Sequence, residues 1–165
     1  MEQPESMTRA ARRVYDILKN HDQETRTIDA QIEAERAALD ADLEEIRSRA
    51  YPRAVRYDTP RVQSSPASGD ALAKMADAIT RRTARTTRAV DALMERQRQI
   101  DSVHEMILAM EAKSKIVLLT LYYPRRTYEQ AAEALAVDVS TVSRRRREAV
   151  NRLTRRFVEI YGETI

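Results

Sequence analysis

The residues with the clearest chemical potential in this chain are arginines gathered in one short stretch. Four are consecutive at positions 144–147, and residues 144–156 hold seven arginines against one acid, Glu148. A guanidinium keeps its charge at all ordinary pH values and can donate hydrogen bonds to phosphate oxygens or to the acceptor edge of guanine. A generic run of charge is usually a solvated helix face. Here the run falls where a helix that reads nucleic acid is predicted, which favours a role in binding.

The stretch TYEQAAEALAVDVSTVSRRRREAVNRL, residues 127–153, has the pattern of two helices joined by a tight turn. Thr127 and Gln130 have the spacing of a capping box, which favours a helix that starts at Thr127. A helix-turn-helix needs a small residue where its two helices cross, and Ala132 occupies that place. The pattern therefore predicts a helix-turn-helix in this part of the chain.

The second helix of this motif is predicted to start at Ser140, whose side chain can cap it. Val142 is its apolar anchor and Ala149 follows at helical spacing, so both are expected to face inward. The residues that then face outward are Ser143, Arg144 and Arg147.

We predict that the helix at residues 140–156 binds double-stranded DNA in the major groove. Ser140 and Thr141 lie at its start, where N–H groups and hydroxyls can hold phosphate. Arg144 is the first candidate for reading a base, because arginine can bind guanine through paired hydrogen bonds. The further candidates are Ser143 and Arg147 for bases, and Arg145, Arg152, Arg155 and Arg156 for phosphates.

The fold is predicted to be all-α, because glycine is nearly absent and aromatic residues make up only 5% of the chain. Apolar residues at helical spacing predict a first long helix in residues 1–50, followed by a Pro/Ser-rich loop at 51–69. A second long helix, capped by Asp70 and carrying a seven-residue apolar repeat, is predicted at 70–112. Two nearly equal helices joined by one loop favour a long antiparallel helical hairpin, a coiled coil, followed by a small helix-turn-helix domain at 113–165.

Polar residues interrupt both apolar seams of this predicted hairpin, among them Asp42 on the first helix and Arg82 and Thr86 on the second. Two helices alone bury little surface, so we expect the hairpin to pair with another copy, a dimer being favoured, or with a partner protein. Residues 80–88, TRRTARTTR, contain no large apolar residue. We interpret them as a weak point in the coil, the alternative being a contact surface.

The segment VLLTLYYPRRTYEQAAEALAVDVSTVSRRRREAVNRL, residues 117–153, resembles region four of bacterial sigma factors, which reads the −35 promoter element. The segment YDTPRVQSSP is followed by a long helix and then by the helix-turn-helix. In this arrangement, residues 50–160 resemble phage-encoded late-transcription regulators of the ArpU and RinA type. The resemblance implies a phage or prophage regulator that binds promoter DNA, with RNA polymerase as a further partner. Carried over by position, it implies DNA contacts from Ser140, Thr141, Ser143, Arg144 and Arg147.

Two residues depart from the pattern of these families. Ala136 stands in the turn, where helix-turn-helix proteins usually have glycine, and a left-handed backbone there would cost an alanine about 1 kcal/mol. Arg146 stands where sigma factors usually have leucine. Either its stem lies along apolar surface, or the helix is rotated and packs less tightly.

Other chemistry is not indicated by the sequence. There is no cysteine, so no disulfide or thiolate metal site is expected, and no apolar run reaches the about 20 residues that span a bilayer. His21 and His104 are interpreted as structural residues rather than metal ligands. We therefore predict a protein of the bacterial cytoplasm that is not an enzyme, has no cofactor or metal, and does not enter a membrane.

The leading hypothesis is a sequence-specific DNA-binding transcription regulator of phage or prophage origin. The first alternative is a DNA-packaging recognition protein similar to the small terminase subunits of phages, which also join a helix-turn-helix to helical oligomerisation segments. The second alternative is a coiled-coil structural or adaptor protein, in which the basic helix is only a solvated end. Assembly into a ring favours the first alternative, and undetectable affinity for duplex DNA favours the second.

Overall fold

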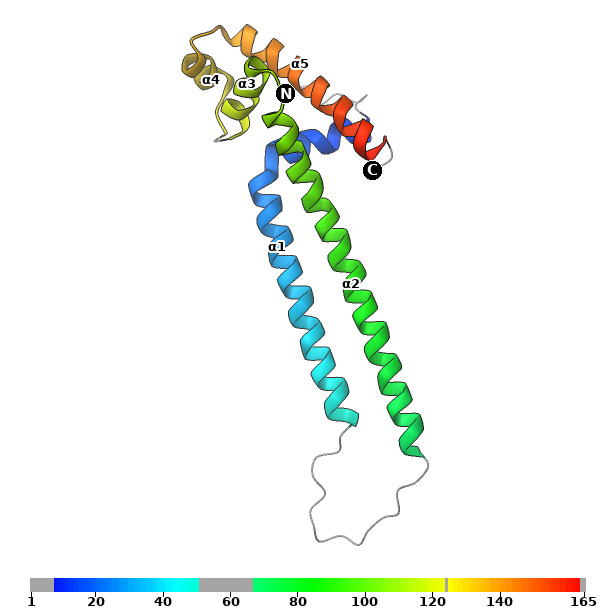
Figure 1. Cartoon of the computed structure of the whole chain (residues 1–165). Helices are drawn as coiled ribbons and strands as arrows, with labels where there is room; N and C mark the ends of the chain where they lie inside the picture. The colour runs from blue at the N-terminus through cyan, green and yellow to red at the C-terminus, as the bar shows by residue number, and fades with distance from the viewer. Residues whose placement is uncertain (1–7, 51–66, 124, 164–165) are drawn as a thin grey trace. The chain divides into compact units, whose positions relative to one another are not determined.

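The computed structural model describes residues 8–50, 67–123 and 125–163, and all regular structure in these ranges is helical (Figure 1). The all-α prediction is therefore confirmed. No helix in the described ranges is both long enough and apolar enough to cross a membrane. In chain order the helices are α1 Arg9–Ala50, α2 Ala67–Leu108, α3 Ala112–Tyr122, α4 Tyr128–Leu135 and α5 Val139–Tyr161.

The two long helices have 42 residues each, which confirms the prediction of nearly equal lengths. The predicted cap of the second helix is wrong, because α2 begins at Ala67 and Asp70 lies within its first turn. In that position the Asp70 carboxylate is 2.6 Å from Lys74 Nζ, one turn further along, and it stabilises the positive end of the helix dipole. Most of the predicted loop, residues 51–66, lies outside the described residues, and residues 67–69 belong to α2.

The chain divides into two compact units. The hairpin unit is Thr27–Arg96, and the core unit combines Met1–Arg26 with Gln97–Ile165.

The hairpin unit consists of one segment of α1 and one of α2, which lie side by side and antiparallel (Figure 1). Only Ile28 and Thr86 are buried among its described residues, so the apolar seam is only partly closed. Arg82 and Asp42, two polar interruptions of the seam, are partners, with Arg82 Nε donating to Asp42 Oδ2. This pair places residues 42 and 82 at the same level and thereby defines the register of the two segments.

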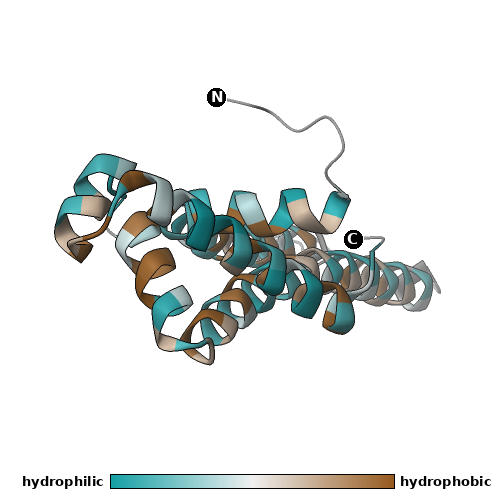
Figure 2. Ribbon diagram, turned by 90° about the horizontal axis from the view of Figure 1, so that it is seen from above, coloured by the Kyte–Doolittle hydropathy of each residue, from teal (hydrophilic) through white to brown (hydrophobic). Residues whose placement is uncertain are grey.

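The core unit contains most of the buried apolar surface. Ten of the eleven largest fully buried side chains belong to it, and Ile28 is the exception. Each such side chain contributes about 1.5–3 kcal/mol when it leaves water, so hydrophobic stabilisation is concentrated in this unit. Its short helices carry both hydrophobic and hydrophilic residues, as Figure 2 shows. The ten side chains are Val14, Ile17, Leu18, Val103, Ile107, Val117, Leu118, Val142, Leu153 and Phe157.

Tyr123 lies between the two histidines of the chain, within the core unit. Its ring centroid is 4.0 Å from that of His21 and 5.2 Å from that of His104, and its hydroxyl is 3.1 Å from His104 Nδ1. Burial, with a contribution from Asp22, raises the pKa of Tyr123 to about 12. Both histidines therefore pack against an aromatic ring. Among the described residues, no group of three or more His, Asp or Glu side chains is placed to hold a metal ion.

We expect the core unit to lose stability as the pH falls below about 6.5. Burial lowers the pKa of His21 from its ordinary value of 6.5, nearby Asp22 partly opposes this, and His104 and Arg125 lower it further. A histidine with a lowered pKa binds fewer protons in the folded state than in the unfolded state. The contribution of neutral His21 to stability is therefore fully present at pH values above the pKa of this histidine in the unfolded chain. It is lost as the pH falls toward the lower pKa of His21 in the folded protein.

Urea unfolding at about pH 7.5 and about pH 5.5, on either side of the ordinary histidine pKa, measures this loss. His21→Gln cannot take up the proton, so its free energy of unfolding should depend less on pH than that of the wild type. An equal pH dependence in the two proteins would show that His21 is not the responsible group.

Candidate nucleic-acid interface

The predicted helix-turn-helix is present as α4, a short turn and α5, and its first helix has the predicted cap. Thr127 Oγ1 accepts a hydrogen bond from the backbone N–H of Gln130 at 3.3 Å. The side-chain oxygen of Gln130 accepts one from the backbone N–H of Thr127 at 3.0 Å. This reciprocal capping box satisfies two N–H groups and fixes where α4 begins.

The turn after α4 depends on Ala136, whose backbone is left-handed with φ 51° and ψ 46°. The N–H of Ala136 donates to the carbonyl of Glu133 at 3.2 Å, and that of Val137 donates to the carbonyl of Ala132 at 3.1 Å. These bonds close α4 and redirect the chain into α5. A side chain in this conformation costs about 1–2 kcal/mol, because its Cβ crowds the following carbonyl. The chain thus accepts alanine where its backbone favours glycine.

A small apolar core holds α3, α4 and α5 together. Its buried residues come from all three helices, and the small side chains on α4 allow that helix to approach α5 closely. Leu135 and Val137 bracket the turn and pack against this core, as the sequence predicts. The buried members are Val117, Leu121, Ala131, Ala132 and Val142, with Tyr122 and Tyr128 packed against them.

The start of α5 differs from the prediction, because the helix begins at Val139 and its cap residue is Asp138. The prediction that Ser140 caps this helix is therefore wrong, and Ser140 lies exposed in the first turn. The carbonyl of Asp138 accepts hydrogen bonds from the N–H groups of Thr141 at 3.0 Å and Val142 at 3.1 Å. The N–H groups that precede these two lack acceptors within the helix and are the ones available to an anion.

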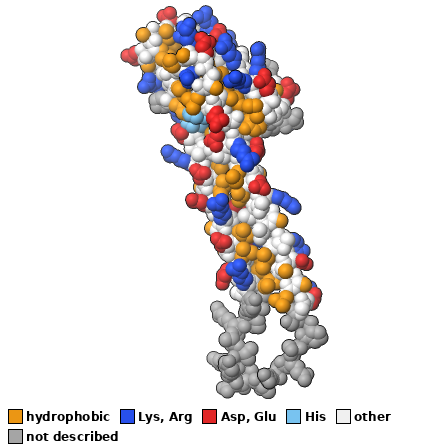
Figure 3. Space-filling model, in the orientation of Figure 1, with side chains coloured by type: hydrophobic (Ala, Val, Ile, Leu, Met, Phe, Trp, Pro, Cys, Tyr) orange, Lys and Arg blue, Asp and Glu red, His pale blue; other side chains and the backbone are white. Residues whose placement is uncertain are grey.

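The outer face of α5 is a row of exposed polar and basic side chains. Ser140, Arg144 and Arg147 recur at intervals of four and three residues and are all exposed, which confirms the predicted exposure of the two arginines. The same face continues through Asn151, which we did not identify from the sequence. Its spacing of four residues from Arg147 is the signal that would have found it, and an amide can bind adenine. Lys and Arg side chains gather around the helix-turn-helix in Figure 3.

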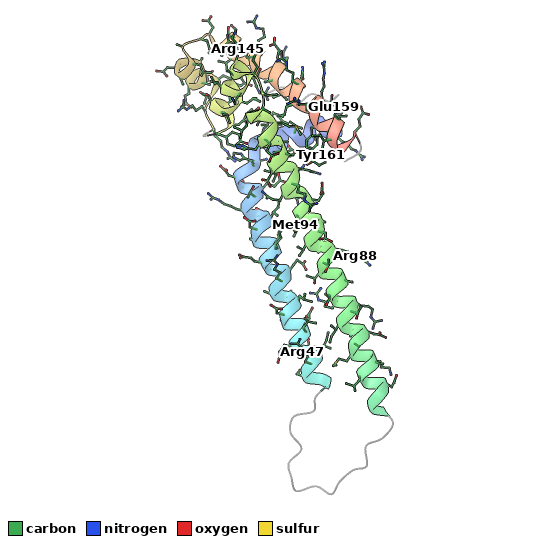
Figure 4. The ribbon with its side chains drawn as sticks, viewed as in Figure 1. Arg47, Arg88, Met94, Arg145, Glu159 and Tyr161 are labelled. Carbon is green, nitrogen blue, oxygen red and sulfur yellow. The ribbon has the colours of Figure 1, made fainter. Side chains whose placement is uncertain are left out.

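Of the other predicted contact residues, Arg155 and Arg156 are exposed further along α5, and the rest are less accessible. Thr141, Ser143 and Arg145 are half-buried, and Arg145 is labelled on α5 in Figure 4. Arg152 is 58% exposed, but its Nη1 lies 3.6 Å from Glu111 Oε2, which offsets part of its charge. The structure therefore brings Ser140, Arg144 and Arg147 onto one exposed face of α5. Arg155 and Arg156 lie two to three turns further along the same helix.

Arg146 turns away from this face and packs against tyrosines. Its Nε donates to the Tyr122 hydroxyl at 2.9 Å, and its guanidinium carbon lies 5.5 Å from the ring centroid of Tyr15 and 5.9 Å from that of Tyr122. Val142 and Ala149 are fully buried, so α5 keeps the rotation that the sequence predicts. Of the two explanations offered for an arginine at this position, packing of its stem and head against neighbouring side chains is the one observed.

Replacing Ala136 by glycine should raise the free energy of unfolding by a few tenths to about 1 kcal/mol. Relief of the left-handed strain exceeds the entropy that glycine adds to the unfolded chain. Ala134→Gly, at an exposed position inside α4, is the matched control and should lower stability by about 1 kcal/mol. Chemical unfolding of both variants measures the difference. An Ala136→Gly protein that is less stable than the wild type would contradict the strain argument.

Truncation of two neighbouring arginines should change the free energy of unfolding by different amounts. Arg146→Ala removes a hydrogen bond, two aromatic contacts and a half-buried stem, so it should lower the free energy of unfolding by about 1–3 kcal/mol. Arg147→Ala removes an exposed side chain and should change stability by less than about 0.5 kcal/mol. Equal stability of the two variants, measured by urea unfolding, would exclude the packing role assigned to Arg146.

A scan against protein-family models and searches of curated proteins and of solved structures find no match to this chain. The resemblance to sigma region four and to phage regulators therefore stays a prediction from the sequence. The function of the chain is therefore inferred from the geometry of α4, the turn and α5.

Proposed function

We propose that this chain is a sequence-specific DNA-binding transcription regulator of phage or prophage origin, and that α5 enters the major groove. The observation that carries the proposal is the exposed set Ser140, Arg144 and Arg147 near the start of α5, next to a capped α4 and a tight turn. In a helix-turn-helix, residues near the start of the second helix contact base edges while the first helix crosses the backbone. A groove about 12 Å wide admits such a helix.

The exposed side chains have separable roles in this proposal. Arg144 is the base reader, because its planar group can donate paired hydrogen bonds to guanine. The first turn of α5, with the hydroxyl of Ser140, faces phosphate. Arg155 and Arg156 are exposed two to three turns further along and contact phosphate as well. Glu148 is an exposed acid on the same helix and weakens attraction to DNA of unrelated sequence.

Our proposal places the protein in the bacterial cytoplasm, with promoter DNA as its ligand, RNA polymerase as a further partner and no catalytic step. A packaging protein of the small-terminase type would use the same helix with less dependence on sequence. A coiled-coil adaptor would not bind DNA at all. These alternatives differ in what the purified chain does with duplex DNA.

The test is selection of a random duplex library by the purified full chain, followed by sequencing, at about physiological salt because phosphate contacts depend on ionic strength. An enriched motif supports the regulator. Bound DNA without a motif indicates contact with the backbone alone and favours the packaging protein. The absence of bound DNA overturns both and leaves the adaptor.

Within the selected motif, Arg144→Ala should cost about 1–3 kcal/mol at one base position and relax the preference there. Arg155→Ala removes the same charge from the same helix and is the matched control. It should weaken binding to all sequences alike and reduce the slope of affinity against salt by about one unit. Full retention of the motif by Arg144→Ala would show that another residue reads the base.

A further inference from the structure

An open cleft of about 550 Å³ lies in the core unit. Sites for small molecules occupy about 300–1,000 Å³, so the cleft has the size of such a site. Its lining comes from residues 21–25 of α1, from residues 97–105 of α2 and from Tyr123, which follows α3. None of the described residues that line it belongs to α5, so the proposed DNA contact does not use this cleft.

The rim of the cleft is acidic. Asp22, Asp101 and Glu105 line it and are exposed, and among the described residues no lysine or arginine does so. Arg125 adds to burial in lowering the pKa of His21, so its charge is nearby, but it lies outside the lining. Figure 3 shows pale blue histidine atoms at the visible surface of the core unit, with red acidic side chains beside them. Carboxylates gathered in a cleft attract cations and repel anions.

The His21 ring has a hydrogen-bond acceptor without a donor. Its Nε2 lies 2.8 Å from Asp22 Oδ1, and Nε2 must carry the hydrogen because a carboxylate only accepts. Burial lowers the pKa of His21 from 6.5, so the ring is neutral at about pH 7.5 and Nδ1 keeps its lone pair. This Nδ1 is buried, and within the described chain nothing donates to it.

Gln97 repeats this arrangement on α2. Its Nε2 donates to Asp101 Oδ1 at 3.0 Å, which fixes the orientation of the amide. The amide oxygen Oε1 is buried, and it also lacks a donor among the described residues. Two helices therefore each bring an unsatisfied acceptor to the lining of the same cleft. Buried acceptors are seldom left without a partner, and a ligand that donates hydrogen bonds would satisfy both.

We propose that this cleft binds a small organic cation of the alkylguanidinium kind, which carries several N–H groups on a short apolar stem. The N–H groups donate to His21 Nδ1 and Gln97 Oε1, and the positive charge lies among the carboxylates of the rim. Both acceptors lie beneath the surface of the cleft, so the ring and the amide rotate slightly toward the ligand. Ile100 and Tyr123 also line the cleft and pack against the stem.

Other ligands fit the cleft less well. An anion would lie against three carboxylates. A metal ion needs several ligands held together, and no group of three or more His, Asp or Glu side chains in the described ranges is placed to hold one. A quaternary ammonium ion has the charge but no hydrogen for the two acceptors. The inference goes beyond the proposed function and does not rest on it.

Calorimetric titration of the full chain with butylguanidine, at about physiological salt, tests the proposal. The dissociation constant should be about 1 mM or lower. Butyltrimethylammonium has the same charge and stem without N–H groups, so it should bind at least about tenfold more weakly. Equal affinities, or no binding of butylguanidine at about 10 mM, would overturn the inference. Tighter binding of the peptide acetyl-Gly-Arg-Gly-amide would overturn the assignment to a free small molecule, since the guanidinium would then belong to a partner chain.

Variants of the lining separate hydrogen bonding from charge. Gln97→Met keeps the volume and removes the acceptor, so it should weaken binding of butylguanidine at least about tenfold. Asp101→Asn removes one charge from the exposed rim and should weaken binding about two- to fivefold. Asp16→Asn is the matched control, because Asp16 is exposed on α1 outside the cleft, and it should leave the affinity unchanged. Circular dichroism should show equal helix content in all three, and unchanged affinity in a folded Gln97→Met protein would contradict the proposal.

Nitrogen NMR of the histidine rings locates the ligand. The chain has two histidines, His21 and His104, so few resonances need assignment. Butylguanidine should shift the Nδ1 resonance of His21, because this nitrogen gains a donor, whereas butyltrimethylammonium should not. An unmoved Nδ1 resonance of His21 in the presence of saturating butylguanidine would show that the cation binds elsewhere and would overturn the inference.

Discussion

Burial of Val142 decides which chemistry α5 can perform. Once this side chain packs into the core beneath α3 and α4, the helical repeat of about 3.6 residues sets the direction of every other residue on α5. Arg144 and Arg147 then face solvent, whereas Arg146 meets Tyr122. A run of four identical side chains is thereby divided into exposed residues, which we propose bind DNA, and one that packs within the fold. Arg144 and Arg147 are therefore exposed because the opposite, apolar face of α5 is buried in the core.

Much of this could be predicted, because it depends on residues close together in the sequence. The periodicity of apolar residues predicts the long helices, and the spacing of Thr127 and Gln130 predicts their capping box. The exposure of Arg144 follows from the position of Val142 on the same helix. The first residue of a helix is harder to predict. Asp70 and Ser140 are residue types that often cap helices, yet both lie within the first turn of their helix. A cap is worth only about 1 kcal/mol, so packing and neighbouring residues can override it.

Contacts between distant residues were not predictable from one sequence. Nothing in the pattern joins Tyr15 to Arg146, or brings His21 onto Tyr123, because those pairs meet only after several helices have packed. Asp42 and Arg82 were recognised separately as interruptions of their seams, yet their pairing required the register of both helices. Ile17 is buried together with Val14 and Leu18, so the apolar face of α1 in the core unit is wider than a single line of residues at helical spacing.

The tyrosines around Arg146 have a consequence for how the chain is made. Tyr15 belongs to α1, Tyr122 to α3 and Arg146 to α5, so this cluster joins residues translated early and late. On the ribosome, the contact between Tyr15 and Arg146 cannot form until α5 has left the exit tunnel. Contacts of such large sequence separation slow folding, so Tyr15 lacks this partner while α2 and α3 are made. A copy interrupted before α5 would therefore lack both the helix that we propose contacts DNA and the core residues that α5 supplies.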